Sequence, residues 1–425
     1  MLELNFIRTN KERVIQGLIK RNFSEERLQV VEEILALDDA RKRAQTDLDN
    51  NLAESKRLSD QIGGLMRQGK KEEGEALKAR VAELKELAAT LATEKANAET
   101  SLEELLLSVP NIPHESVPSG TTPEDNEVFQ TWEKPMPDLP ADALPHWELA
   151  KKYNVFDLDL GVKLTGAGFP VYRGKGARLE RALVNFFLDE ASKAGYEEIQ
   201  PPLMVNPDTA RATGQLPDKE GQMYFVERDN FYLIPTAEVP VTNIYRDVIV
   251  EAKDFPIKMT AYTPCFRREA GSYGAHVRGL NRVHQFDKVE IVQIAHPDTS
   301  YIQLNEMLAH VSQLLDKLEL PYRILRLCGG DMSFTSALTF DFEVWSAAQQ
   351  RWLEVSSVSN FETYQSNRLK VRFKHEGKNR LAHTLNGSAL ALARIVAALL
   401  ENNQTAEGIR LPKVLHAYTG FEMID

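Results

Sequence analysis

The chain has 425 residues, of which 43% are hydrophobic and 27% charged, and this is the balance of a soluble globular protein with two or three domains. Its only cysteines, Cys265 and Cys328, are too few for a disulfide framework or a cysteine-rich zinc site, and they favour a reducing compartment. The formal charge of −11 argues against a nucleic-acid partner on average. The segment 41–95, however, holds 12 basic against 10 acidic residues, so any contact with a polyanion should concentrate there.

Neither a signal peptide nor a membrane span is expected. The opening residues MLELNFIRTNKER place charges where a signal peptide needs an apolar core. The longest apolar run, 388–400, has 13 residues, contains Arg394, and is too short to cross a bilayer. We therefore expect a cytoplasmic protein.

Residues 24–107 contain no proline and have the Ala, Glu, Lys, Leu and Arg composition of long helices. The second half keeps the 4,3 spacing of a coiled-coil seam, whereas the stretch DDARKRAQTD in the first half offers no large apolar residue. Gly63, Gly64, Gly69 and Gly74 between the halves provide breaks at which the chain can reverse. We expect an antiparallel helical hairpin over about 26–107, either a solvated arm or a helix pair that packs on a partner or on the body.

Residues 110–145 hold 8 of the 20 prolines and read as a linker and extended connection. Beyond it, an amphipathic helix is predicted over 177–194, and β-branched and aromatic runs predict strands at 231–234, 258–269, 283–294, 338–345 and 351–358. A final helix is expected over 387–401. These elements do not alternate as in a parallel sheet, so we predict an α+β fold with a mostly antiparallel sheet flanked by helices. The expected domains are 1–109, 110–170 (linker and start of the next domain) and 171–425.

Three groups of residues could carry chemistry. Arg267 and Glu269 are two apart on a predicted strand, so they share a face and could hold a phosphate and an amine, or form a surface salt bridge. Arg394 lies in an apolar helix and needs an anion, either a ligand or a carboxylate of the protein. Glu354 with Ser356 and Ser357 offers oxygens suited to Mg²⁺. The glycine cluster at 166–176 lacks the Gly-Lys-Ser/Thr spacing of a phosphate loop.

In combination, the order and identity of these blocks resemble the class II aminoacyl-tRNA synthetases, and specifically the seryl-tRNA synthetase family in its bacterial type. The blocks are TAEV at 236–239, FRREAGSYG at 266–274, EVSSVSNFETYQSNR at 354–368 and HTLNGSALALAR at 383–394. The resemblance covers essentially the whole chain, including the long hairpin. It implies the class II catalytic domain, with 177–194 and the following strand as motif 1, FRRE as motif 2, and 387–394 as motif 3.

The resemblance also implies the site residues. Arg267, Glu269 and Arg394 would be catalytic, and Glu354 and Ser357 would hold Mg²⁺, with no zinc. The residues implied for ATP are Arg267, Arg268, Glu269, Val283, Glu354, Val355, Ser356, Ser357 and Arg394. Those implied for L-serine are Thr236, Ala237, Glu238, Glu290 and Ser388, with Glu290 on the serine hydroxyl.

The implied reaction activates L-serine with ATP to seryl-adenylate and pyrophosphate, then transfers serine to the 3′ end of tRNA(Ser) and, where it exists, tRNA(Sec). A homodimer is implied, with the arm holding tRNA. Three rivals remain: a ligase that loads a carrier protein, a non-catalytic RNA-binding paralogue, and a coiled-coil assembly protein. The hairpin argues against the first, the five retained residues Arg267, Glu269, Glu354, Ser357 and Arg394 against the second, and the last three quarters of the chain against the third.

Overall fold

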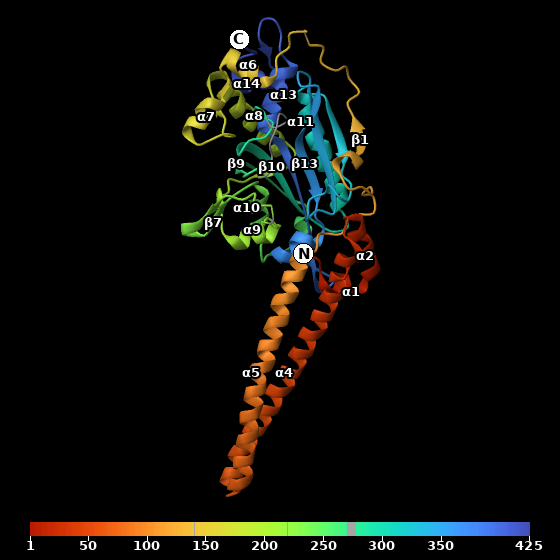
Figure 1. Cartoon of the computed structure of the whole chain (residues 1–425), viewed down its shortest axis with the longest axis vertical. Helices are drawn as coiled ribbons and strands as arrows, with labels where there is room; N and C mark the ends of the chain where they lie inside the picture. The colour runs from red at the N-terminus through yellow and green to blue at the C-terminus, as the bar shows by residue number, and fades with distance from the viewer. Residues whose placement is uncertain (140, 219, 270–277) are drawn as a thin grey trace. The chain divides into compact units, whose positions relative to one another are not determined.

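The computed structural model of the protein describes residues 1–139, 141–218, 220–269 and 278–425 (Figure 1). The chain forms two compact units, Met1–Pro110 and Asn111–Asp425. Within the described ranges, every helix is too short or too polar to cross a membrane. The segment that follows FRRE, residues 270–277, lies outside the described residues.

The N-terminal unit is all helical and is dominated by two 38-residue helices, α4 (Val30–Arg67) and α5 (Lys71–Ser108), which lie side by side in opposite directions (Figure 1). The expected hairpin is confirmed. The chain reverses at Gly69, which has a φ of 78° that glycine adopts without strain. Gly63, Gly64 and Gly74 do not break the helices. The unit also contains α1 (Leu4–Thr9), α2 (Lys11–Lys20) and α3 (Glu25–Leu28).

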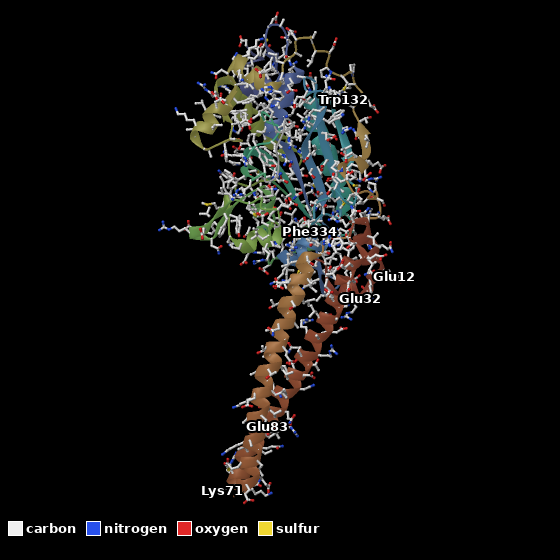
Figure 2. All side chains as sticks on the ribbon, viewed as in Figure 1. Glu12, Glu32, Lys71, Glu83, Trp132 and Phe334 are labelled. Atoms are coloured by element: carbon white, nitrogen blue, oxygen red, sulfur yellow. The ribbon has the colours of Figure 1, made fainter. Side chains whose placement is uncertain are left out.

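The hairpin seam is apolar near its far end, where Leu58, Val81 and Leu84 are buried together, and at its base, where Val31, Ile34, Leu102 and Leu106 are buried. Between these two ends, Asp38, Ala44 and Asn51 occupy buried positions of α4, which explains the poor apolar pattern in its sequence. The side chains between these positions project outward along the arm, including Lys71 and Glu83 (Figure 2). Most of the hairpin surface is therefore polar and exposed.

The C-terminal unit is built on an eight-stranded sheet, and the expected α+β class is confirmed. All neighbouring strands are antiparallel except β4 and β9. In spatial order the strands are β1 (Glu127–Thr131), β11 (Tyr322–Arg326), β12 (Leu338–Ser346), β13 (Arg351–Asn360), β16 (His383–Ala391), β10 (Gln285–Ala295), β9 (Ile257–Phe266) and β4 (Glu197–Glu198).

Three helices bury apolar faces against this sheet in one large core: α8 (Gly174–Lys193), α11 (Ser300–Lys317) and α13 (Leu392–Asn402). Helix α8 begins three residues before the predicted position, and its buried side chains include Leu179, Leu183, Phe186 and Phe187. The helix expected from Gly387 is partly wrong, because residues up to Ala391 pair with β10 as strand β16.

The remaining elements are short and lie around the sheet. The segment 110–170 contains α6 (His146–Tyr153), β2 (Phe156–Asp157) and α7 (Leu158–Leu164), and β3 (Val171–Tyr172) pairs with β2. A small sheet of β5 (Met204–Val205), β7 (Phe231–Leu233) and β6 (Phe225–Val226) is accompanied by α9 (Pro207–Thr213) and α10 (Glu238–Asn243). The other short elements are β8 (Ile249–Val250), α12 (Thr363–Leu369), β14 (Arg372–His375), β15 (Lys378–Leu381), β17 (Ile409–Arg410), α14 (His416–Thr419) and β18 (Met423–Ile424).

Candidate active site

A cavity of about 550 Å³ opens on the sheet of the C-terminal unit. On β10, Phe286, Lys288 and Glu290 line it, whereas Val289 and Ile291 belong to the apolar core. This separation follows from the alternation of side chains along a strand. One face of β10 therefore builds the site while the other anchors it.

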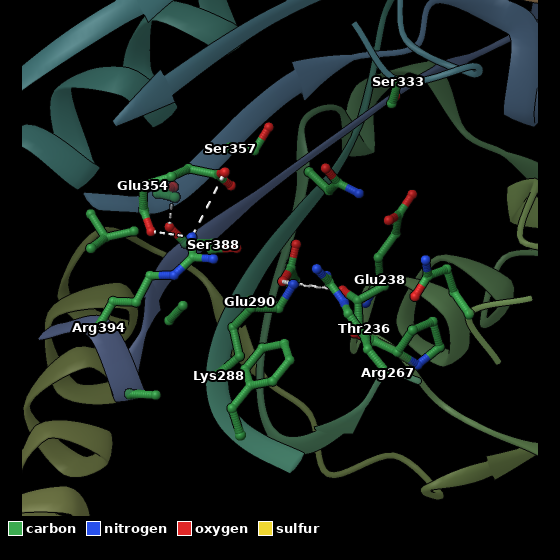
Figure 3. A pocket seen from close by; sticks show the side chains of 18 of the residues that line it. Thr236, Glu238, Arg267, Lys288, Glu290, Ser333, Glu354, Ser357, Ser388 and Arg394 are labelled. Atoms are coloured by element: carbon green, nitrogen blue, oxygen red, sulfur yellow. Dashed lines mark hydrogen bonds and ion pairs between the residues drawn. The ribbon is translucent and has the colours of Figure 1, made fainter. Parts of the chain in front are cut away.

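Twelve of the fourteen residues implied for ATP and serine line this one cavity (Figure 3). The two that do not are Arg268, whose guanidinium carbon is 5.5 Å from the ring centre of Tyr224, and Ala237, which is fully buried beside the cavity wall. The twelve come from segments spread over about 160 residues of chain. They are Thr236, Glu238, Arg267, Glu269, Val283, Glu290, Glu354, Val355, Ser356, Ser357, Ser388 and Arg394.

At one end of the cavity, Arg394 in the first turn of α13 faces β13 (Figure 3). Its Nη1 donates to the Glu354 carbonyl at 2.6 Å and lies 3.7 Å from the Glu354 carboxylate, and its Nε donates to the Asn281 carbonyl at 2.8 Å. Burial lowers the pKa of this guanidinium, and the Glu354 carboxylate acts against that shift. Protein oxygens thus hold Arg394 in place, and its side chain stays on the cavity wall.

Arg267 and Glu269 also face the cavity, but not as a strand pair. The expectation that they share a strand face is wrong, because β9 ends at Phe266 and Glu269 has a left-handed φ of 49°. Arg267 donates from Nε to the Pro235 carbonyl at 3.2 Å, and its guanidinium carbon is 5.2 Å from the ring centre of Phe286. Glu269 pairs with Arg282 at 2.8 Å, so the salt bridge lies inside the cavity rather than on a solvated face.

The other end of the cavity holds a buried ionic group on β10. Lys288 Nζ is 2.6 Å from Glu290 Oε2, and it donates to the Thr236 hydroxyl at 2.9 Å. The Thr236 hydroxyl in turn donates to Glu290 at 3.3 Å. Both charged side chains are at most 6% exposed, so the pair is shielded from water and each charge depends on the other.

Glu238 lies beside this group as the first residue of α10. Its carboxylate accepts from Gln365 Nε2 at 2.6 Å, and Gln365 is fixed by donating to the Thr213 carbonyl and accepting from Thr384. Burial and the nearby Glu290 charge raise the pKa of Glu238 to about 7, although the Gln365 hydrogen bond acts in the opposite direction. A cation bound beside Glu238 would therefore favour its charged form at neutral pH.

The oxygens near Glu354 fit a hard divalent cation. The Ser357 hydroxyl and the Glu354 carboxylate both line the cavity, and Asp341, opposite Ser357 on β12, has an oxygen, Oδ1, that is buried without a hydrogen-bond partner in the described part of the chain. Burial and the charge of Glu354 raise the pKa of Asp341 well above its ordinary value. Carboxylate and hydroxyl oxygens are the ligands that Mg²⁺ prefers. Among the described residues, no group of three or more His, Cys, Asp and Glu side chains is arranged to hold a metal ion.

Sequence reasoning missed several residues of the wall, above all Phe286, Lys288 and Asn386. The first two could have been found, because they stand four and two positions before Glu290 on a predicted strand and must share its face. Asn386 could not be found in this way, because it directly precedes Gly387, where a helix was expected to begin, whereas the structure places it within strand β16.

The chain is similar to known proteins over its whole length. Residues 1–113 match the family model of the seryl-tRNA synthetase N-terminal domain, and residues 224–403 match the tRNA synthetase class II core domain (G, H, P, S and T). A serine–tRNA ligase of Salinibacter ruber is 53% identical over 427 residues, covering 100% of this chain and 99% of its own.

Two solved structures are similar over the whole chain. Seryl-tRNA synthetase from Pyrococcus horikoshii complexed with ATP superposes with a TM-score of 0.92 at 32% identity, covering 100% of this chain and 99% of the other. Cytoplasmic serine–tRNA ligase from Naegleria fowleri in complex with AMP gives a TM-score of 0.87 at 25% identity with the same coverage. With its helical arm, its antiparallel class II sheet and relatives of this similarity, the chain belongs to the seryl-tRNA synthetase family and is a serine–tRNA ligase.

Proposed function

We propose that the cavity joins L-serine to ATP and that the seryl group is then passed to the 3′ end of tRNA(Ser). The observation that carries this proposal is that one cavity holds three guanidinium groups, of Arg267, Arg282 and Arg394, and the buried Glu238 and Glu290 carboxylates. In the first step the serine carboxylate attacks the α-phosphorus and pyrophosphate leaves. In the second, a ribose hydroxyl of the tRNA attacks the seryl carbonyl and AMP leaves. No protein nucleophile is required, so placement and charge neutralisation supply the catalysis.

ATP would lie along the end of the cavity that Arg267, Glu269 and Arg394 line. Arg267 would hold the α-phosphate, Glu269 would accept from the adenine amine, and Arg394 would contact the adenine face and the γ-phosphate. Val283, Val355 and Ser356 would complete the contact surface. The structural relatives from Pyrococcus horikoshii and Naegleria fowleri were solved in complex with ATP and with AMP, which supports a nucleotide as ligand. Arg268 is left out, because its side chain lies outside the cavity wall.

Serine would occupy the end lined by Thr236, Glu238, Glu290 and Ser388. Glu238 would hold the ammonium group and Glu290 the hydroxyl, while Ala237 would shape the wall from behind. If a buried carboxylate accepts a hydrogen bond from the serine hydroxyl, it is left without a partner when alanine binds. The kcat/KM for alanine is then lower than that for serine by as much as about 10⁴-fold. Threonine must be excluded by volume.

Glu354 and Ser357 are the residues that would hold Mg²⁺, with Asp341 behind them. When bound, the ion would neutralise charge on the phosphates. The residues of the chain would still do the positioning: the Glu354 carbonyl accepts from Arg394, which lines the cavity and would face the nucleotide.

The basic arm segment 41–95 would bind the sugar-phosphate backbone of the tRNA. tRNA(Sec) would be a second substrate where it exists. We further propose that the protein is a cytoplasmic homodimer. Light scattering at micromolar concentration tests the last point, since a mass near the 48.0 kDa of one chain would contradict it.

Pyrophosphate exchange into ATP tests the central proposal. Exchange should depend on serine, be far weaker with alanine, threonine or glycine, and fall by ~10²-fold or more in Arg267→Ala. Arg410→Ala, which removes an exposed arginine of the same unit, is the matched control and should match the unmodified protein. Absence of exchange with every amino acid, in folded protein, would reject the proposal in favour of a non-catalytic paralogue.

A further inference from the structure

His146, the first residue of α6, is fully buried and lies at the centre of a polar network outside the cavity. Its Nε2 accepts from the Leu280 backbone amide at 2.8 Å, and its Nδ1 is 2.7 Å from Glu401 Oε1. Because an amide can only donate, Nε2 carries no proton, and the ring proton therefore sits on Nδ1 and points at Glu401. The two contacts fix both the tautomer and the orientation of the ring.

Glu401, on α13, is also fully buried and is saturated with donors. Its Oε1 accepts from the His146 backbone amide and from Gln349 Nε2, each at 2.9 Å, and its Oε2 accepts from Ser346. Burial raises the pKa of Glu401, but the hydrogen bonds from His146 and Ser346 bring it below its ordinary value. A charged carboxylate thus binds α6 to the helix that carries Arg394.

A second set of contacts ties α6 to the turn 278–281, which leads back into β10. Arg278 is 3.4 Å from Glu148, and its guanidinium carbon is 4.7 Å from the ring centre of Trp147. Gly279, with a φ of 71°, passes so close to the His146 ring that an added Cβ would overlap Nε2. Three consecutive residues of α6 therefore hold this turn.

The turn carries part of the wall at the nucleotide end. Leu280, Asn281, Arg282 and Val283 line the cavity. The Asn281 carbonyl accepts from Arg394, and Arg282 pairs with Glu269. Any shift of the turn would therefore move Arg282 and Val283 on the cavity wall, and with them the Asn281 carbonyl that accepts from Arg394.

We propose that His146 is a positioning residue for the nucleotide: by joining the Leu280 amide to the Glu401 carboxylate, it fixes the turn 278–281 against α13 and so sets Arg394, Arg282 and Val283. The inference rests on the proposed function, since it presumes a nucleotide at this end. The serine end is held by a different set of contacts, from β10, α10 and α12. Loss of His146 should accordingly affect ATP far more than serine.

Pyrophosphate exchange with the full chain gives both KM values. We expect His146→Ala to raise the KM for ATP about tenfold, because misplacement of groups by a fraction of an ångström costs this much, while the KM for serine stays within about twofold. Glu401→Ala should act alike. Glu401→Gln keeps an acceptor for Nδ1–H and should remain within about threefold of the unmodified protein.

The matched control is His310→Ala, which removes another buried histidine of the same unit, on α11, that lies outside the cavity wall. It should lower the melting temperature and leave both KM values unchanged. If His146→Ala does not fold, Gly279→Ala applies the same displacement from the side of the turn and should give the same selective rise.

Three results would overturn the inference: a folded variant whose KM for ATP equals that of His310→Ala, equal rises in both KM values, or Glu401→Gln as impaired as Glu401→Ala. Absence of exchange in the unmodified protein would instead reject the proposed function. The two failures are therefore distinguishable.

Discussion

Glu238 is a buried carboxyl group whose pKa lies close to neutral pH. Its pKa of about 7 means that the carboxylate is charged above that pH and neutral below it. In the proposed function the charged form of Glu238 holds the serine ammonium, so kcat/KM for serine should fall as the pH drops below about 7. Gln365→Leu removes the hydrogen bond that lowers this pKa, and the acidic limb should move to higher pH.

The pH profile of serine-dependent pyrophosphate exchange checks this shift. Gln303→Leu is the control, because it removes another buried glutamine, on α11, outside the cavity wall. Identical limbs in the two variants would mean that Glu238 does not govern serine binding.

Lys288 is the residue on which the charge of Glu290 depends. Lys288→Met leaves Glu290 buried without a counter-charge and removes the ammonium that holds both Glu290 and the Thr236 hydroxyl, a loss of about 3 to 5 kcal/mol. The carboxylate proposed to accept from the serine hydroxyl is then no longer held in place. We expect kcat/KM for serine to fall by about 10²-fold, with the KM for ATP within about threefold, in the exchange assay.

The same substitution at Lys258 is the control. Lys258 pairs with Glu306 at 2.9 Å, but the glutamate is 49% exposed, and such pairs contribute at most about 1 kcal/mol. Equal losses in both lysine variants would contradict a specific role for the buried pair.

For single residues, the sequence predicts which residues line the cavity better than it predicts their backbone conformation. The motif residues could be predicted because the order and identity of their blocks resemble those of a known family, and Phe286 and Lys288 follow from Glu290 by strand alternation. The left-handed backbone of Glu269 could not, since glutamate has no preference for it and the loop around it imposes it. His146 carried no signal either, because its partners are more than 130 residues away.

Among the elements, α1 and α4 are joined by one buried carboxylate. Asp38 is 2% exposed, and Arg8, Arg41 and Lys42 approach it at 2.9, 2.9 and 2.6 Å. Burial raises the pKa of Asp38, but these three hydrogen bonds bring it down to about 2. The stabilisation is therefore complete above the ordinary aspartate pKa and is lost as the pH falls toward 2.

Asp38→Ala should lower the free energy of unfolding of the helical unit by about 2 kcal/mol at pH 7, since three cations lose their shared partner. Urea unfolding followed by circular dichroism at 222 nm measures this change. Asp47→Ala, at an exposed position of the same helix, is the control and should change stability by less than about 0.5 kcal/mol. A loss at Asp38 no larger than at Asp47 would show that the cluster does not stabilise the unit.

The predictability of elements follows the same physics. Long helices and strands with a clear period, such as α5, α8 and β10, could be predicted from their pattern alone. The change from β16 to α13 at Ala391 could not, because the run from Ser388 to Leu400 is apolar except for Ser388 and Arg394, and a buried strand and a buried helix then look alike. Asp38 and Asn51 hid part of the α4 seam, since a buried polar residue reads as an exposed position.

At the scale of the whole molecule, the cavity and the basic segment lie in different units. Every residue that lines the cavity lies between Gln215 and Arg394, within the C-terminal unit, whereas the basic excess lies in the hairpin. Deletion of 28–107 with a short linker should therefore leave serine-dependent pyrophosphate exchange within about threefold. Charging of tRNA should fall by ~10²-fold or more, because contacts to many phosphates are lost at once.

Salt and charge provide the control for that deletion. In the full chain, replacing the exposed Lys56, Arg57 and Lys85 by Gln removes positive charge without shortening the arm. Charging by this variant should weaken and depend less steeply on salt, while exchange stays unchanged. Loss of exchange on deletion would mean that the arm is needed for the fold of the catalytic unit. Undiminished charging by the deleted protein would mean that the arm does not bind tRNA, and the basic excess of its surface would then need another partner.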